Sequence, residues 1–282
     1  MLLGCMLLAV VVGFALLRQY SNQQRQATLE QLSALVAQQP DQAEETLRAM
    51  LNETPDSAEV RQLVFQCLYG QGKYEEAAEF AVDWVNRSGE SYEAHYALAK
   101  TRHALAQLPA ATESMRTAMH LSPNADARRE IGVELLGMLI EAEDTSAART
   151  QFEYLRTIGA DGRVPKLQLA YLLRLEGRFE DARRLLGEVL DASPDSVAAK
   201  MLLGVVHLDL GEYELAAKQL AEVVADQPEN KEAHFKLALA LGRLGRTSEA
   251  ARHFAINQRL VQASQAVLER RGDKDEAVRR EE

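Results

Sequence analysis

The sequence is poor in cysteine, proline and aromatic residues. Only two cysteines, Cys5 and Cys67, occur among 282 residues, so a disulfide framework is excluded, and no CxxC pair is present to hold zinc. Aromatic residues make up 6% of the chain. The abundant Ala, Leu, Glu, Arg and Gln favour helices, because these side chains lose little rotamer freedom there. The seven prolines and sixteen glycines then act as punctuation between helices.

An excess of basic charge is also missing. The formal net charge is −10 and no basic stripe offsets it, which argues against nucleic acid as a partner because an anionic body repels phosphate. The chain is 47% hydrophobic and 26% charged, so it can form a packed core and is not a disordered protein.

Sequence motifs of enzymes and cofactor sites are absent. The sequence contains no HExxH, GxSxG or GxxxxGK segment and no paired Cys/His ligands, each of which has a spacing that its chemistry requires. The sequence therefore predicts no catalytic residue, no cofactor, no metal site and no small-molecule substrate.

Charged side chains are missing from residues 1–17, which end before Arg18. As a helix this segment spans about 25 Å, at the low limit for a hydrocarbon core of about 30 Å. Tyr20 and Arg18 are suited to the membrane interface. Because the segment is apolar on every side, whereas a core helix shows one polar face, we predict a transmembrane anchor at residues 1–20. We therefore expect a single-pass membrane protein located in the bacterial inner membrane.

Two alternatives to a retained anchor stay open. Gly13-Phe14-Ala15 has the form of a signal-peptidase site, and Leu2-Leu3-Gly4-Cys5 resembles a bacterial lipobox. Both lack a positively charged region before the apolar run. Cleavage at either would leave a periplasmic assembly factor or a lipoprotein. Two arginines after the segment, Arg18 and Arg25, leave the side of the soluble body undetermined.

The remaining chain carries a period of 34 residues. Gly177, Gly211 and Gly245 are spaced at this interval in matching segments, and Gly72 begins the same pattern. A period of this size indicates stacked helical hairpins. One small residue recurs once per unit: Ala77, Ala111, Ala148, Ala182, Ala216 and Ala250.

This pattern resembles the tetratricopeptide repeat, whose unit is a pair of antiparallel helices. The resemblance implies an all-α, right-handed superhelical solenoid of helical hairpins, preceded by the N-terminal transmembrane helix. The alanine column would lie where the two helices of a hairpin approach most closely. The loop glycines would supply positive φ. The expected domains are the anchor 1–20, a degenerate capping repeat 24–57, six repeats at 58–91, 92–125, 129–162, 163–196, 197–230 and 231–264, and a C-terminal capping helix with a charged tail at 265–282.

In this family the first helices of the hairpins line a concave groove, so the resemblance implies that a protein or peptide binds there. The groove is polar and acidic in its N-terminal half and apolar in its C-terminal half. The apolar residues form a strip that predicts a docking site for a helix or an extended peptide, unless the superhelix buries part of it. The predicted groove residues are Tyr69, Tyr96, Lys100, Leu167, Tyr171, Arg174, Met201, Val205, Phe235, Leu239 and Arg243.

One binding mode of the family is argued against. Units that grip acidic chaperone tails use lysine and asparagine at set groove positions, where this sequence has Gln62, Gln66 and Ala97. The resemblance thus implies a non-enzymatic, membrane-tethered scaffold that recruits a protein or peptide in envelope assembly, secretion or complex biogenesis.

Overall fold

The structure is a computed structural model that describes the backbone of residues 26–281 and the side chains of residues 26–266. Within this part of the chain every regular element is a helix. The predicted anchor at residues 1–20 and both alternative cleavage motifs lie outside the described residues. Among the helices that are described, none combines the length and the apolar character needed to cross a membrane.

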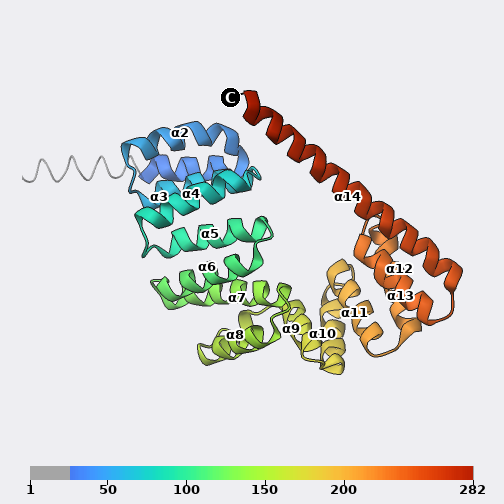
Figure 1. The fold of residues 1–282 in the computed structure, drawn as a ribbon. Helices are drawn as coiled ribbons and strands as arrows, with labels where there is room; N and C mark the ends of the chain where they lie inside the picture. The colour runs from blue at the N-terminus through green and yellow to red at the C-terminus, as the bar shows by residue number, and fades with distance from the viewer. Residues whose placement is uncertain (1–25, 282) are drawn as a thin grey trace, which may run out of the picture. The chain divides into compact units, whose positions relative to one another are not determined.

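The helices form two compact units that divide after Ala142. In the first unit the chain reverses direction at each turn, so that consecutive helices lie antiparallel (Figure 1). The first described helix of this unit covers residues 26–38. It is followed along the chain by α2, and both helices lie within the segment predicted as a capping repeat. The other helices are α2 (Pro40–Glu53), α3 (Ala58–Gly70), α4 (Tyr74–Arg87), α5 (Tyr92–Ala104), α6 (Leu108–Leu121) and α7 (Ala125–Glu141).

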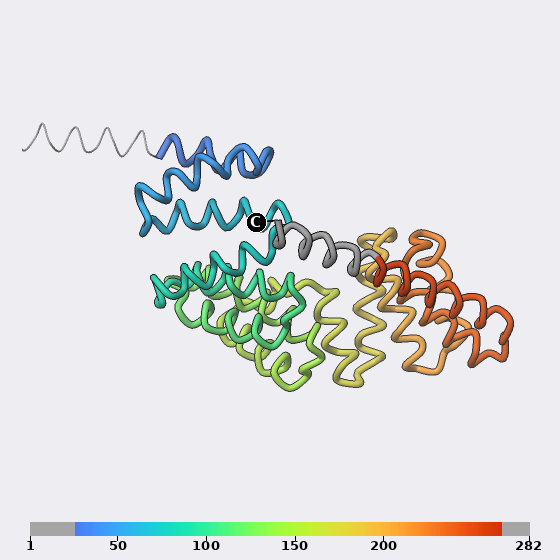
Figure 2. Tube along the Cα trace, turned by 45° about the horizontal axis from the view of Figure 1, so that its top comes forward, coloured from blue at the N-terminus to red at the C-terminus, as the bar shows by residue number. Residues whose placement is uncertain are grey.

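The second unit repeats this up-and-down arrangement, which the Cα trace in Figure 2 also shows. The helices of one hairpin pack against each other and against the next hairpin. The elements are α8 (Thr145–Thr157), a 3-10 turn η1 (Asp161–Arg163), α9 (Lys166–Leu175), α10 (Phe179–Ala192), α11 (Val197–Asp209), α12 (Tyr213–Asp226), α13 (Lys231–Arg243) and α14 (Thr247–Glu281).

Short polar residues start most of the first helices. The side chain of Ser57 accepts a hydrogen bond from the backbone amide of Val60, at the third position of α3. This bond satisfies one of the amides that a helix start leaves without a partner. The same cap recurs before α5, α7, α11 and α13, formed by Ser91, Asn124, Ser196 and Asn230.

The turn inside each hairpin needs one residue with positive φ. The prediction for the loop glycines is confirmed, since Gly72, Gly177, Gly211 and Gly245 have φ between 72° and 76°. The two hairpin turns without a glycine use Ala106 and Glu143 at φ 57° and 54°. Non-glycine residues reach this left-handed region at a cost, because Cβ approaches the following carbonyl oxygen.

The alanine column is buried in the structure. Its members from Ala77 to Ala216 are fully buried, and Ala250 is 6% exposed. The core around them is built from aliphatic side chains, with Trp84 as a large buried member. A larger side chain in this column has no room without separating the helices.

Three element boundaries differ from the sequence register. α7 begins at Ala125, so the three extra residues 126–128 form its first turn, capped by Asn124. η1 precedes α9, which begins only at Lys166, after Pro165. α14 runs from Thr247 to Glu281 as one helix of 35 residues, so the backbone of the predicted capping helix at 265–282 continues the last hairpin without a break.

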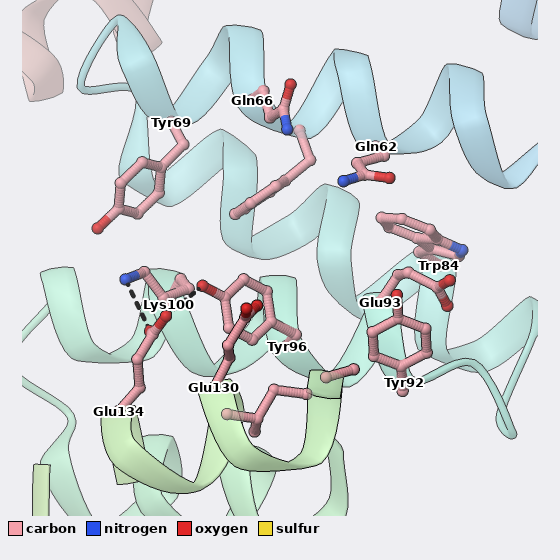
Figure 3. Close-up of a pocket in the computed structure, with 13 residues that line it drawn as sticks. Gln62, Gln66, Tyr69, Trp84, Tyr92, Glu93, Tyr96, Lys100, Glu130 and Glu134 are labelled. Atoms are coloured by element: carbon pink, nitrogen blue, oxygen red, sulfur yellow. Dashed lines mark hydrogen bonds and ion pairs between the residues drawn. The ribbon is translucent and has the colours of Figure 1, made fainter. Parts of the chain in front are cut away.

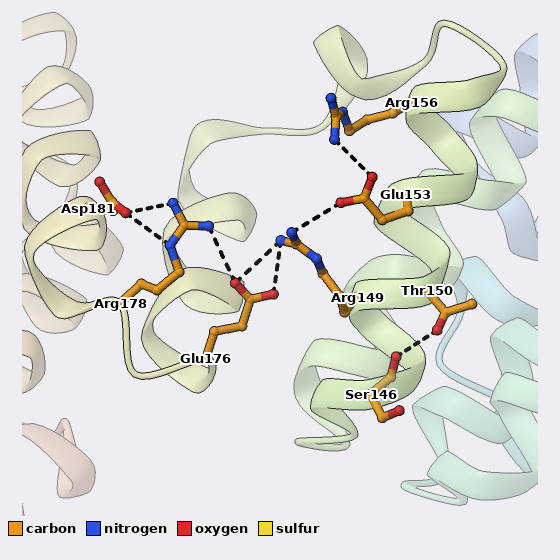
Figure 4. Close-up of polar contacts among 8 residues, drawn as sticks. All are labelled: Ser146, Arg149, Thr150, Glu153, Arg156, Glu176, Arg178 and Asp181. Carbon is orange, nitrogen blue, oxygen red and sulfur yellow. Dashed lines mark hydrogen bonds and ion pairs between the residues drawn. The ribbon is translucent and has the colours of Figure 1, made fainter.

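A network of ion pairs joins α8 to the turn between α9 and α10 (Figure 4). Arg149 contacts Glu153 on its own helix and Glu176 in the turn, each at 3.2 Å. Arg178 continues the network from Glu176, at 3.7 Å, to Asp181, at 2.6 Å. Most of these side chains are half exposed, so each pair contributes modestly, and the network serves to fix the turn.

Candidate protein-binding groove

A pocket of about 420 Å³ opens between the first helices of three successive hairpins in the first unit. It lies between α3 on one side and α5 and α7 on the other (Figure 3). The first helices are the elements that the repeat register assigns to the concave face. The lining residues are Gln62, Phe65, Gln66 and Tyr69 from α3, Trp84 from α4, Tyr92, Glu93, Tyr96 and Lys100 from α5, and Ala127, Glu130, Ile131 and Glu134 from α7.

Aromatic rings form much of the pocket wall. Phe65 and Trp84 are buried, at 8% and 1% exposure, and they present only ring surface. The ring of Tyr69 packs against that of Phe65, with centroids 5.6 Å apart and planes tilted by 41°, and meets Tyr74 edge-on at 5.2 Å. Because these rings are held by packing, the pocket is formed before any partner arrives.

Glu134 joins α5 to α7 at the floor of the pocket. The hydroxyl of Tyr96 donates a hydrogen bond to its Oε1 at 2.8 Å, and Lys100 Nζ donates to its Oε2 at 3.1 Å. Burial, together with the carboxylate of Glu134, raises the pKa of Tyr96 well above its usual value. Tyr96 therefore stays a neutral hydrogen-bond donor at physiological pH.

The pocket carries an excess of negative charge. Three carboxylates, those of Glu93, Glu130 and Glu134, line it beside one ammonium, that of Lys100. Glu93 accepts a hydrogen bond from the hydroxyl of Ser91 at 2.8 Å, which keeps its side chain at the start of α5. Nearby on the same face, His103 and Glu141 are paired at 2.6 Å.

Three of the predicted groove residues, Tyr69, Tyr96 and Lys100, line this pocket together. The sequence register missed Phe65 and Trp84, because a residue assigned to the core was not expected to form a pocket wall as well. It also missed Glu134. The signal for Phe65 was present, since a large ring stands where most units have a small residue.

The predicted apolar strip in the second unit is divided by burial. Met201 and Val205 are only 8% and 7% exposed and belong to the core between α11, α12 and α13. Phe235 and Leu239 are each 39% exposed on α13. The remaining two strip residues, Leu167 and Tyr171, are half-buried on α9. The strip is thus only partly exposed, and its role in binding stays a prediction.

The two arginines predicted to line the groove of the second unit, Arg174 and Arg243, differ in their surroundings. Arg174 Nε contacts Asp209 Oδ2 at 2.6 Å, joining α9 to the end of α11. Arg243 is exposed at the end of α13. The ring of Phe235 meets Phe254 edge-on at 5.8 Å, so this exposed ring is oriented by a neighbour on α14.

Two buried titratable side chains outside the pocket, those of His234 and Cys67, have hydrogen-bond partners within the protein. His234 is buried and lies with its Nδ1 2.9 Å from that of His253 and its Nε2 3.0 Å from the carbonyl of Pro228. Burial raises the pKa of the Cys67 thiol, which donates to the carbonyl of Pro40 at 2.8 Å. Within the same residues no three His, Cys, Asp or Glu side chains gather as a metal site.

Comparison with solved structures shows the same fold in other proteins. A tetratricopeptide repeat protein from Parabacteroides merdae ATCC 43184 matches 84% of this chain over 93% of its own, at 15% identity and a TM-score of 0.63. A chain of the Cut9–Hcn1 hetero-tetramer of APC/C matches 81% of this chain over 45% of its own, at 13% identity and a TM-score of 0.64. Human IFIT1, solved as a dimer with PPP-AAAA, also matches. The match covers 78% of this chain and 55% of IFIT1, at 18% identity and a TM-score of 0.56. The chain spans about half the length of the last two.

The sequence was also compared with protein-family models and with curated protein sequences. No curated protein sequence matches the chain. The tetratricopeptide repeat family matches it twice, over residues 34–87 and 173–234, one match in each unit. These matches agree with the hairpins, the buried alanine column and the turn glycines, and they show that each of the two units contains tetratricopeptide repeats.

Proposed function

We propose that this protein is a non-enzymatic scaffold that recruits a partner protein or peptide on the concave face formed by its first helices. The tetratricopeptide fold itself suggests protein–protein interaction. The observation that carries the proposal is the pocket between α3, α5 and α7. It has rigid aromatic walls and a few convergent polar groups, which is the composition of a binding site.

Nucleic acid is the less favoured partner. The human IFIT1 structure contains PPP-AAAA, so the same fold can hold a polyanion elsewhere. In this chain the pocket holds three carboxylates beside one ammonium, and the net charge is −10. Phosphates brought to such a surface would meet repulsion, whereas peptides carry no such penalty.

The scaffold is proposed to be tethered to the bacterial inner membrane by residues 1–20, with a role in envelope assembly, secretion or complex biogenesis. The support is the absence of charge from residues 1–17 and their length. The alternative is a periplasmic assembly factor or lipoprotein with a cleaved N-terminus. Membrane fractionation with N-terminal sequencing separates them, since a mature chain that starts at Leu16 or at Cys5 would contradict the tether.

The binding proposal is tested with the full-length chain in mild detergent and an unbiased library of displayed peptides. We expect selected peptides whose binding is lost in Tyr96→Ala, because the pocket loses a wall and its link to Glu134. The control is Val82→Ala, which changes an exposed residue of α4. Peptides that bind both variants equally, or no selected peptide at all, would contradict the proposal.

A further inference from the structure

We propose that the pocket between α3, α5 and α7 takes a lysine or arginine side chain from an extended basic segment of the partner protein. This inference rests on the proposed function and names the chemistry of the partner at the same groove. Three properties of the pocket carry it: its charge, the setting of its own lysine, and the polar groups at its rim.

The charge of the pocket selects for a cation. Glu93, Glu130 and Glu134 line it, and each has an interaction of its own: Tyr96 and Lys100 contact Glu134, Ser91 donates to Glu93, and Glu130 is also engaged. The lining thus has two more negative than positive groups. In a partly enclosed site such an excess attracts a cation more strongly than it would in open water, and it repels the carboxylate of an acidic peptide.

Lys100 shows that this environment already holds an ammonium group. Its Nζ lies 5.8 Å from the centroid of the Tyr96 ring and 3.1 Å from a Glu134 oxygen. A tyrosine face and a carboxylate together stabilise a cation. Tyr69 and Trp84 place further rings around the same cavity, so a second cation would find similar surroundings.

The rim of the pocket suits an extended backbone. Gln62 and Gln66 are exposed on successive turns of α3 and face the cavity (Figure 3). Amide side chains can both donate to and accept from the peptide groups of a bound strand. A cavity of about 420 Å³ exceeds one side chain, so the adjacent backbone also has room.

The experiment uses the full-length chain and three short fluorescent peptides that share one Gly/Ser background. They carry arginine, uncharged citrulline or glutamate at the same positions, and binding is followed by fluorescence polarisation. The variant Glu93→Gln/Glu130→Gln removes two charges from the pocket. Its control, Glu79→Gln/Glu113→Gln, removes two charges from exposed positions of the second helices α4 and α6.

We expect the arginine peptide to bind about tenfold more tightly than the citrulline peptide, and more weakly as salt is raised. The pocket variant is expected to remove this preference and the control variant to keep it. Equal binding of arginine and citrulline peptides, or a preference that survives in the pocket variant, would overturn the inference. Spermidine that competes at the same concentration as the arginine peptide would also overturn it, because the site would then recognise a free polyamine.

Failure of this inference can be told from failure of the proposed function. If the displayed library yields neutral or acidic peptides that depend on Tyr96, the groove binds peptides but the charge argument is wrong. If neither the library nor the three peptides give binding that depends on the pocket, both are wrong.

Discussion

Leu220 on α12 occupies the space that a β-carbon on Gly204 of α11 would need. An ideal β-carbon at Gly204 would lie 2.7 Å from Leu220 Cγ and 2.9 Å from its Cδ2. Leu220 is itself fully buried, so it cannot move aside freely. The two helices of this hairpin therefore meet at a point where only glycine fits.

Gly204→Ala is expected to lower the free energy of unfolding by about 1–2 kcal/mol, because overpacking outweighs the gain in helix propensity. The matched control is Gly187→Ala in α10, where an added β-carbon meets nothing within 4 Å. That control is expected to raise stability by about 0.5–1 kcal/mol. Urea unfolding followed by circular dichroism measures both, and a stabilising Gly204→Ala would contradict the close approach.

Ala106→Gly is expected to stabilise the protein by about 1 kcal/mol, since glycine adopts positive φ without the strain of a β-carbon. Ala106 stands at φ 57° in the turn between α5 and α6, and its side chain is exposed, so no packing is lost. The reverse change, Gly72→Ala, is expected to destabilise the equivalent turn. Thermal unfolding compares the two, and a lower melting temperature for Ala106→Gly would refute the assignment of strain.

Acid sensitivity is expected to centre on Glu44. Its hydrogen bond from Lys73, with others from Arg48 and Gln71, holds the pKa of its carboxyl at about 2, against 4.5 ordinarily. A depressed pKa means that the unfolded state binds the proton more readily. The stabilisation is therefore complete above pH 4.5 and is lost as the pH falls toward about 2.

Glu44→Gln should cost about 1–2 kcal/mol at neutral pH, where charge-assisted bonds are lost, and little near pH 2. The control is Glu45→Gln, which changes the exposed neighbour. Urea unfolding across the pH range gives the answer. An equal loss at neutral and at acid pH would show that the carboxylate charge is not what stabilises this corner.

The second unit offers a separate test of the apolar strip. Tyr171→Ala with Phe235→Ala is expected to weaken partner capture and leave the helical circular-dichroism signal intact, because both side chains keep exposed surface. The control is Leu215→Ala, which changes a residue 48% exposed on the second helix α12. Loss of the helical signal in the double variant would mean that these residues are core.

Constraints that act at a single position could be read from the sequence. The alanine column, the four turn glycines and the helix ends before Pro123, Pro194 and Pro228 all follow from one contact or one backbone angle. Ala106 and Glu143 could not be predicted in this way, because the turn geometry places positive φ on residues that do not favour it. The 34-residue period also did not predict the early start of α7, which Asn124 caps, or the continuous helix α14.

The site was only partly predictable for a related reason. The register identified the face that holds Tyr69, Tyr96 and Lys100, but not the pairing of Tyr96 with Glu134, which joins residues 38 positions apart. Register also does not tell how far the next hairpin covers a face. That is why Met201 and Val205, predicted as groove residues, turn out to be buried.

The central claim is that a partner binds on the concave face of the first helices. It is tested most directly by placing a photo-cross-linking amino acid at Gln66, which lines the pocket from α3, and in a second strain at Val82, exposed on α4. After illumination of living cells, we predict a defined adduct with one protein from position 66 that is absent from position 82 and is lost with Tyr96→Ala. Adducts that are the same from both positions, or that persist in the Tyr96→Ala background, would contradict the claim.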